Sequence, residues 1–319
     1  MRRLAIVLAL AALLPRAAHA QRAITVRADN DAFNFWQLPW SRPDEEYTSG
    51  VRLNVAVDGT AFWARRFQPL LGACPGAESP CAAHAYGFGQ DIYTAVRLRD
   101  VPTALPGGRP DAGVLWVSGS TRVERLATLT ELSWTIGTTG KPSLAEPMQR
   151  FFHSLGPSWN RPITWGRQVP AEPVFAAAWD RRTLAALGAL ELQPHAGASI
   201  GTLLTEARAG VGMRMGAGLS HPWRPHVRER IASVAFVGDA TVRGVARNEV
   251  LSGAFFRGGP SVPLRPVVTE LEGGIRLRWR SVEAAWVAHQ TSAEYTSRHS
   301  AHAWSTLEAS WRPPRRSSP

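Results

Sequence analysis

Side chains of the kinds that bind calcium gather near the start of the chain. Asp29, Asn30 and Asp31 follow the short alternating run 24–28, and Thr48 precedes the next such run. If the two runs are neighbouring strands, their ends meet and bring several hard oxygen donors to the mouth of one hairpin, which suits calcium better than softer metals. Asp and Asn are also common turn formers, so an ordinary polar loop is the alternative interpretation.

A histidine farther along the chain offers a different chemistry. His153 lies four residues after Gln149, in a segment that Pro142 and Ser143 can begin as a helix and that Gly156 can end. Residues four apart are neighbours on one helix face, so Gln149 and His153 are expected to point the same way. An imidazole can act as a general base near neutral pH, whereas a solvated loop histidine is the alternative.

Strands are the elements that must position these residues. Val51, Leu53 and Val55 alternate with polar or small residues, and the same period of two recurs along the chain. We count about twelve such runs of roughly ten residues each. They lie near 23–30, 49–58, 85–94, 112–121, 125–137, 173–185, 190–202, 205–217, 232–246, 267–279, 282–294 and 301–311.

The polar residues of these runs favour a membrane barrel over a soluble sandwich. Rows of arginine fit a polar lumen while their apolar neighbours face lipid. Thirteen tryptophans could supply the aromatic girdles at the two membrane interfaces. The sequence therefore predicts an all-β fold, a transmembrane antiparallel β-barrel of about 12 strands with a short helix on an extracellular loop. The arginines assigned to the lumen are Arg208, Arg214, Arg276, Arg278 and Arg280.

The N-terminus predicts export. Arg2 and Arg3 precede the apolar run 4–14, and the small residues around His19 resemble a cleavage site, so we expect a signal peptide at 1–20 and a single barrel domain at 21–319. The formal net charge of +11 is carried almost wholly by arginine. In an exported protein this charge indicates phosphorylated lipid or anionic glycan rather than nucleic acid. Cys74 and Cys81 could close a small disulfide loop, since no second pair exists for a metal framework.

An even number of strands puts both termini on the periplasmic side, so every odd-to-even connection lies outside the cell. The calcium donors, the helix with His153, and Glu172 before the sixth strand then converge on the extracellular rim. Arg97, Arg99 and Arg109 belong to the same rim and could bind phosphates or acidic sugars. For Arg109, a structural ion pair with Asp111 is the alternative.

Several short motifs in a fixed order resemble the lipid A 3'-O-deacylase family of outer-membrane barrels. The motifs are Asn30-Asp31, Tyr47-Thr48-Ser49-Gly50, Gln90-Asp91-Ile92-Tyr93, Arg109-Pro110-Asp111-Ala112-Gly113, Ile136-Gly137, Gln149 with His153, Trp165 with Gln168, Glu172-Pro173, and Glu294-Tyr295. Together they span nearly all of the chain after residue 20. This resemblance implies a twelve-stranded barrel that removes the 3'-linked acyloxyacyl chain of lipid A in a calcium-dependent reaction similar to that of secreted phospholipase A2.

The resemblance also assigns roles to residues. It implies that His153 is the general base, that Asn30 and Asp31 bind Ca²⁺, and that Thr48 and Gln149 complete the site. The family can place an acid soon after the histidine, but this chain has none there, so Glu172 is taken as the further calcium ligand. Lipid A or lipopolysaccharide and the outer-membrane lipids are the expected partners, and we expect a monomer with its site at the extracellular face.

Two other functions remain open at the level of sequence. A barrel whose site has decayed could serve a structural or transport role, although such a protein has no need of Asn30, Asp31 and His153. A phospholipase-like acyl hydrolase is the second possibility. No Gly-x-Ser-x-Gly elbow is present, which argues against a serine nucleophile of the α/β-hydrolase kind.

Overall fold

The computed structural model of the protein describes residues 21–35, 46–74, 81–96, 107–154, 165–224 and 230–312. The predicted signal peptide lies outside this part of the chain. Thirteen strands are described: β1 (Gln21–Asn30), β2 (Glu46–Asp58), β3 (Ala82–Thr94), β4 (Ala112–Glu124), β5 (Thr128–Thr139), β6 (Pro173–Thr183), β7 (Ala185–Leu187), β8 (Leu190–Gly201), β9 (Leu204–Ala217), β10 (Ala232–Asn248), β11 (Val267–Trp279), β12 (Val282–Thr291) and β13 (His302–Trp311).

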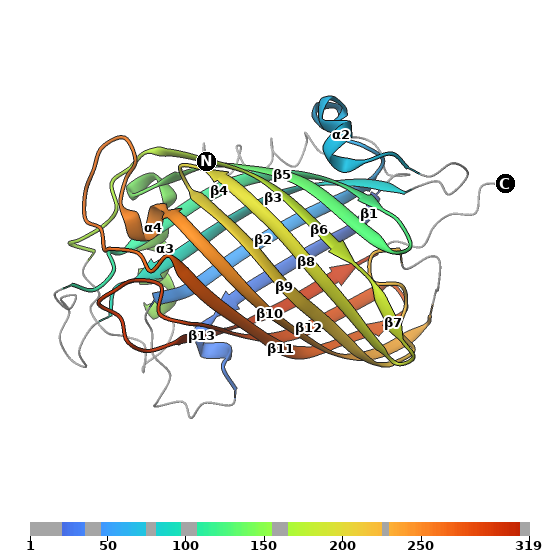
Figure 1. The fold of residues 1–319 in the computed structure, drawn as a ribbon. Coiled ribbons are helices and arrows are strands. Elements are labelled where there is room, and N and C mark those ends of the chain that lie inside the picture. Colours follow the sequence, from blue (N-terminus) through green and yellow to red (C-terminus); the bar gives the residue numbers. More distant parts are fainter. Residues whose placement is uncertain are drawn as a thin grey trace, which may run out of the picture.

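The strands form one closed antiparallel barrel (Figure 1). Each long strand pairs with its neighbours in the chain, and β1 pairs with β13 at the seam. The three-residue strand β7 pairs only with the start of β8, while β6 pairs directly with β8 over seven positions. The ring therefore contains twelve strands, and the predicted fold class is confirmed.

Alternation along the strands separates an apolar exterior from a charged interior. Val51 and Leu53 are 49% and 44% exposed on the outer face, whereas Arg52 between them pairs with Asp91 at 3.0 Å. Ion pairs of this kind recur between strands inside the barrel, which keeps charged groups out of the lipid. Further examples are Arg208 with Asp180, Arg243 with Glu206, Arg214 with Glu191, and Arg276 with Glu283.

One arginine assigned to the lumen is placed differently. Arg280 follows the last residue of β11 in the tight turn to β12, with φ of +52°, and its guanidinium lies over the ring of Trp279. The predicted row of alternating arginines therefore ends at Arg278, whose Nη1 donates to the Ser220 hydroxyl at 3.0 Å. The strand itself ends at Trp279, as predicted, and only the assignment of Arg280 to the lumen is wrong.

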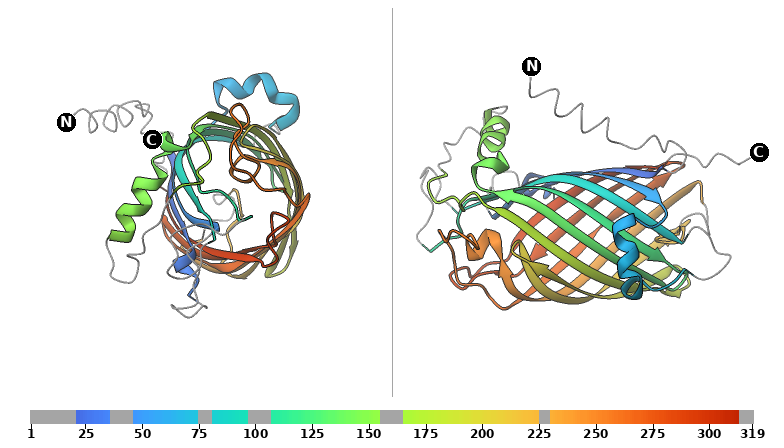
Figure 2. Two further views of the ribbon diagram at one scale, coloured as in Figure 1. Left: turned by 90° about the vertical axis from the view of Figure 1, so that its left-hand side faces the viewer. Right: turned by 90° about the horizontal axis from the view of Figure 1, so that it is seen from above.

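The helices are short and lie at the two ends of the barrel (Figure 2). We call the end at which β1 finishes the α3 rim, and the end at which β1 begins and β13 finishes the terminal rim. The helical segments are η1 (Asp31–Phe33), η3 (Phe62–Phe67), α2 (Gln68–Leu71), η4 (Lys141–Ser143), α3 (Ala145–Ser154) and α4 (Glu249–Ser252). Among the described residues, none of the helices has both the length and the hydropathy needed to span a membrane.

The α3 rim holds an apolar core that narrows the mouth of the barrel. Val250 and Leu251 of α4 pack with Val174 of β6 and with Val114 of β4, and all four are almost fully buried. Since Val174 and Val114 share the inward parity of their strands, α4 lies over the mouth and not over the lipid-facing wall (Figure 1). This core holds the connection between β10 and β11 in place.

The terminal rim carries a second, smaller core outside the wall. Ala64 and Leu71 of the η3 and α2 segment pack against Val123 of β4, and Trp63 contacts Trp134 of β5 edge to face. The disulfide between Cys74 and Cys81, with 5.8 Å between their Cα atoms, joins this segment to β3. The disulfide that the sequence left open is therefore formed.

Candidate functional site on the outer wall at the α3 rim

A row of outward-facing positions crosses four neighbouring strands just below the α3 rim. Asn30 of β1 is paired with Ser49 of β2, Ser49 with Ile92 of β3, and Ile92 with Gly113 of β4. Each of them has the parity of lipid-facing residues of its strand, such as Val26, Val51, Phe88 and Val117, which are 42–51% exposed. The four positions therefore form one band on the outer wall, about 14 Å long at the usual strand spacing.

Helix α3 lies on the outside of the barrel over the end of this band (Figure 2). The Ala145 methyl and the Ser143 side chain occupy the space where a side chain at Gly113 would stand. Gln90 of β3 donates from Nε2 to the Ser143 carbonyl at 2.6 Å. A glycine in the wall and a hydrogen bond from it thus fix the start of the helix against β3 and β4.

Gln149 is held one turn farther along α3. It is only 3% exposed, and Trp165 Nε1 donates to its Oε1 at 2.9 Å. Because an indole N–H can only donate, this contact fixes which end of the amide is oxygen. Gln149 Nε2 is buried and has no hydrogen-bond partner among the described residues. The amide N–H groups are therefore oriented by Trp165 and available to another acceptor.

The remaining predicted residues of the outer site lie at the same rim. His153 is half-buried in the last turn of α3, four residues after Gln149. Asn30 ends β1, and its Oδ1 accepts from the Ala32 amide at 2.7 Å, which caps η1. Asp31, the first residue of η1, is 5% exposed. The structure thus places these residues at the same end of the barrel, with η1 against β13 and β2 and α3 against β3 and β4.

Thr48 occupies an irregularity in β2. The register of β2 on β3 shifts between Tyr47 and Ser49, so Thr48 is an extra residue in the strand. Its hydroxyl shares a 2.6 Å hydrogen bond with the Thr94 hydroxyl, and both residues are buried. The bulge turns Thr48 away from the regular inward and outward positions and toward the rim.

Asp29 does not belong to the outer set. It has the inward parity of β1 and is 1% exposed. Its carboxylate accepts from Arg27 Nε, from the Tyr47 hydroxyl and from the Thr306 hydroxyl, each at 2.7 Å. Neighbouring residues on a strand face opposite sides, so the barrel wall separates Asp29 from Asn30.

Glu172 is not brought to the other predicted calcium ligands. It has the parity of the buried residue Val174 and accepts from the backbone amides of Phe255 and Phe256, the latter at 3.0 Å. Burial favours a higher pKa for Glu172, but a hydrogen bond from Glu249 and those amides outweigh it and lower the pKa. Glu172 therefore anchors the loop after α4 on the mouth side of the wall, whereas Asn30 faces outward.

Arg109 was predicted to bind substrate, and the structure corrects this. The side chain is 1% exposed, its Nη1 lies 3.0 Å from Glu46 Oε2, and its guanidinium lies over the Tyr93 ring. Glu46 also accepts from Tyr295 and Arg298. Arg109 is thus part of a buried ion-pair network, although its partner is Glu46 and not the neighbouring Asp111.

The other two predicted substrate-binding arginines, Arg97 and Arg99, lie outside the described residues. The structure adds two cations that the sequence analysis did not select. Lys141 is exposed in η4, and Arg150 on α3 forms an exposed ion pair with Glu146 at 2.8 Å. Both residues lie close to Gln149 in the sequence, and this proximity could have indicated them as candidates.

The fold and this outer band define an outer-membrane β-barrel that carries polar, potentially reactive groups on its lipid-facing side. A family model described as "Outer membrane protein LpxR" matches residues 4–313. The chain belongs to this family.

Solved structures agree with the assignment of the fold. LpxR from Salmonella typhimurium is similar with a TM-score of 0.72 at 15% identity, over 91% of this chain and 99% of that one. The β domain of the Bordetella autotransporter BrkA has a TM-score of 0.46 at 11% identity, over 92% of this chain and 99% of that one. No curated protein sequence matches the chain.

Proposed function

We propose that the protein is a lipid A 3'-O-deacylase, an ester hydrolase that works on the outer wall of the barrel at the extracellular face. Membership of the LpxR family supports this function. The observation that supports it is the position of α3, the helix of Gln149 and His153, which packs on the lipid-facing side of β3 and β4 at the rim where Asn30 ends β1. Acyl chains of a membrane lipid lie against this same side of the wall.

His153 is the proposed general base. Hydrolysis of an ester requires removal of a proton from the attacking water, and an imidazole performs this near neutral pH. Gln149 is proposed to donate from Nε2 to a reacting oxygen. Trp165 binds Oε1 of the same amide, which leaves Nε2 pointing away from Trp165. Thr48 contributes a hydroxyl that can donate to or accept from the same substrate.

The oxygen donors beside η1 fit a calcium ion. Asn30 offers an amide carbonyl and Asp31 a buried carboxylate, and Thr48 adds a hydroxyl, so the set contains only hard oxygens. Calcium bound there would supply positive charge to the carbonyl oxygen of the ester. Glu172 is not included in this set because it faces the mouth and binds backbone amides.

Recognition of the lipid headgroup is proposed to involve Arg97 and Arg99, together with Lys141 and Arg150 next to the site. Lipid A carries phosphates, to which guanidinium and ammonium groups are complementary. We further propose that the protein acts as a monomer, which the closed ring supports because each of the twelve long strands is paired on both sides.

Mass spectrometry of lipid A from cells that express the protein tests the function. Wild type is expected to release the 3' acyloxyacyl chain, and His153→Ala to leave lipid A intact. Ser154→Ala is the matched control, because Ser154 is the exposed neighbour in the same helical turn. Unchanged lipid A with folded wild-type protein would overturn the proposed function, and deacylation that persists in His153→Ala would overturn the mechanism.

A chelator experiment tests the metal separately. Calcium removal is expected to stop deacylation by wild type, and added calcium to restore it. Asp31→Asn should raise the calcium concentration needed, while Glu172→Gln should leave it unchanged because Glu172 lies on the other side of the wall. Equal calcium requirements in wild type and Asp31→Asn would exclude Asp31 from the calcium site.

A further inference from the structure

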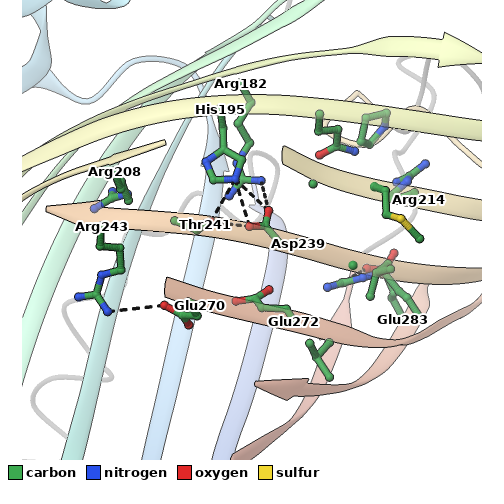
Figure 3. Close-up of a pocket in the computed structure, with 18 of the residues that line it drawn as sticks. Arg182, His195, Arg208, Arg214, Asp239, Thr241, Arg243, Glu270, Glu272 and Glu283 are labelled. Carbon is green, nitrogen blue, oxygen red and sulfur yellow. Dashed lines mark hydrogen bonds and ion pairs between the residues drawn. The ribbon is translucent and has the colours of Figure 1, made fainter. Parts of the chain in front are cut away.

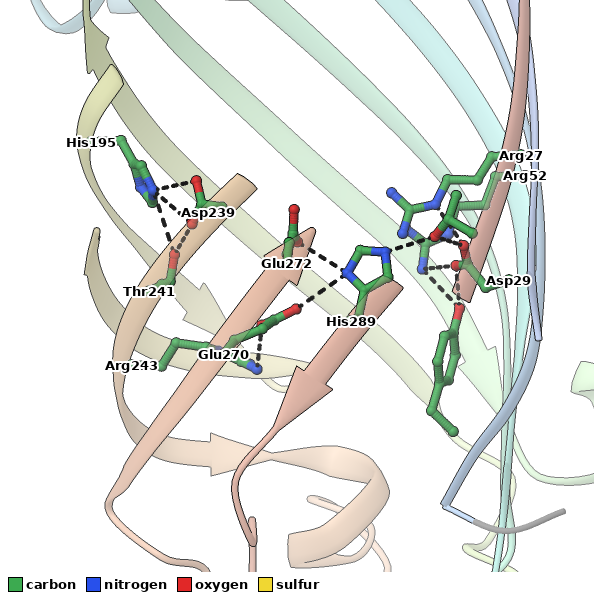
Figure 4. A network of polar contacts seen from close by, with 12 residues as sticks. Arg27, Asp29, Arg52, His195, Asp239, Thr241, Arg243, Glu270, Glu272 and His289 are labelled. Carbon is green, nitrogen blue, oxygen red and sulfur yellow. Dashed lines mark hydrogen bonds and ion pairs between the residues drawn. The ribbon is translucent and has the colours of Figure 1, made fainter. Parts of the chain in front are cut away.

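Three side chains in the barrel interior, away from the outer site, converge as metal ligands do. Glu270 and Glu272 alternate on β11 and therefore face the lumen together, and His289 of β12 is the direct cross-strand partner of Glu272. His289 Nδ1 lies 3.1 Å from Glu272 Oε1 and 3.9 Å from Glu270 Oε1. The three ligand atoms all lie within 4.8 Å of one another (Figure 4).

The hydrogen bonds of His289 determine which ring nitrogen carries the proton. Its Nε2 lies 2.8 Å from the Thr306 hydroxyl, and that hydroxyl donates its hydrogen to Asp29 at 2.7 Å. Thr306 can therefore only accept from His289, so Nε2 is protonated. Asp29 is itself held by Arg27. The other ring nitrogen, Nδ1, therefore faces the two carboxylates.

The negative charge of the two carboxylates beside Nδ1 needs a positive partner, which either a proton on Nδ1 or a bound cation can supply. The imidazole ring cannot rotate away, since it is 5% exposed and stacks on Trp304 with an interplanar angle of 4°. Arg243 forms an ion pair with Glu270, with its Nη1 3.6 Å from Glu270 Oε2. The contact of Nε2 with Thr306 is also typical of metal-bound histidines. In such histidines the ring nitrogen that does not bind the metal donates a hydrogen bond, which fixes the orientation of the ring.

The distances identify the class of ion. Ligand atoms about 2.1 Å from a tetrahedral zinc ion are about 3.4 Å from each other. The observed 3.1 and 3.9 Å lie on either side of that value. An imidazole nitrogen among the ligands favours zinc-like ions over calcium or magnesium, which prefer oxygen alone.

Space for a further ligand lies beside the cluster. Glu270 and Glu272 line a lumen cavity of about 630 Å³, shown in Figure 3. A water molecule there could complete a four-coordinate site. We propose that Glu270, Glu272 and His289 bind a zinc-class divalent ion that cross-links β11 to β12 and, through Thr306 and Asp29, braces the seam between β13 and β1.

Metal content of the full chain purified in detergent tests the proposal. After treatment with a chelator and dialysis against zinc, wild type is expected to bind one zinc ion in the lumen. The count is repeated in an Asp31→Ala background, so that an ion bound by the proposed outer calcium ligands is not mistaken for it. Glu272→Gln and His289→Gln should lose this ion, whereas His195→Gln, at the other lumen histidine paired with Asp239, should keep it.

A positioning variant adds a readout that does not depend on deleting a ligand. Thr306→Val removes the acceptor of the Nε2 proton and is expected to weaken zinc binding about 10- to 100-fold while the barrel remains folded. A wild-type lumen that binds no zinc would overturn the proposal, as would equal zinc affinity in wild type and His289→Gln. A ring of His289 protonated on both nitrogens in the presence of zinc, seen by nitrogen NMR, would also overturn it.

Discussion

The position of α3 on the outer wall depends on the absence of a side chain at Gly113, and this can be tested by adding one methyl group. In Gly113→Ala, the new Cβ would stand closer than 3.0 Å to Ala145 Cβ and to Ser143 Oγ. Carbon atoms in contact are normally about 3.5–4.0 Å apart. The start of α3 must therefore move outward by about 1 Å, which carries Gln149 and His153 with it.

The expected loss of activity is large, whereas the cost in stability should leave the barrel folded. A displacement of about 1 Å can reduce a rate about 100-fold, which corresponds to about 2.7 kcal/mol in the barrier. Overpacking costs about 1–3 kcal/mol. That strain falls at the surface of a barrel whose strand pairing is unaffected, so the folded fraction should remain high.

The assay compares initial rates of 3' deacylation in detergent with barrel folding measured by heat-dependent mobility on gels. Gly273→Ala is the matched control, since Gly273 is also an outward-facing strand glycine but has no atom within 4 Å of the point where the added methyl group would stand, and its rate should change less than about 2-fold. A Gly113→Ala protein that is folded and as fast as wild type would refute the view that the reaction takes place beneath α3.

Three further predictions follow from the contacts at the α3 rim. Trp165→Phe should slow deacylation about 5-fold, the effect of losing about 1 kcal/mol of hydrogen bonding to Gln149, and an unchanged rate would remove that contact from the mechanism. Arg109→Met should lower the free energy of unfolding by about 3 kcal/mol because it leaves Glu46 short of a buried partner, as measured by urea titration; weaker substrate binding with normal stability would contradict this. Burial and the hydrogen bond to Glu172 raise the pKa of Glu249 to about 7, above its ordinary 4.5, so its proton stabilises the docked loop fully below about pH 4.5 and the effect is lost as pH rises through 7. After correction for the intrinsic pH dependence of exchange, the protection of residues 249–262 should therefore fall above pH 7 in wild type but not in Glu249→Gln, and equal corrected pH profiles would contradict the assignment.

Much of the barrel could be predicted from the sequence because alternation is a local property. The run from Val51 to Val57 shows its two faces without knowledge of any other strand, and the structure places Val51 outward and Arg52 inward as expected. The bounds of β11 were also predicted, but Arg280 was assigned to the lumen because the alternation of arginines continues one residue past the end of the strand.

The partners of buried charges could not be predicted in the same way. Arg109 and Glu46 are 63 positions apart and β3 lies between the strands that they adjoin, so no local pattern predicts their contact. Glu172 likewise precedes a strand near the expected rim, but its parity with Val174 sends it to the mouth side of the wall. The predicted order of the strands put Arg109 and Glu172 at the correct end of the barrel. Their contacts depend on whether each side chain faces into the barrel or out of it, which was not predicted.

The lumen cluster shows a signal that was present but unused. Glu270 and Glu272 alternate in the sequence, and His289 lies on the next strand across a two-residue turn, so their register follows from the hairpin alone. The requirement for a fixed tautomer comes from Thr306 and Asp29, which belong to the distant seam of the barrel.

The outward position of the band from Asn30 to Gly113 has a kinetic consequence. A lipid that meets this face arrives by lateral diffusion within its own leaflet and need not be lifted into solution. Turnover in mixed micelles should then follow the mole fraction of lipid A at the micelle surface, so that adding inert detergent at a constant amount of lipid A slows the reaction by surface dilution.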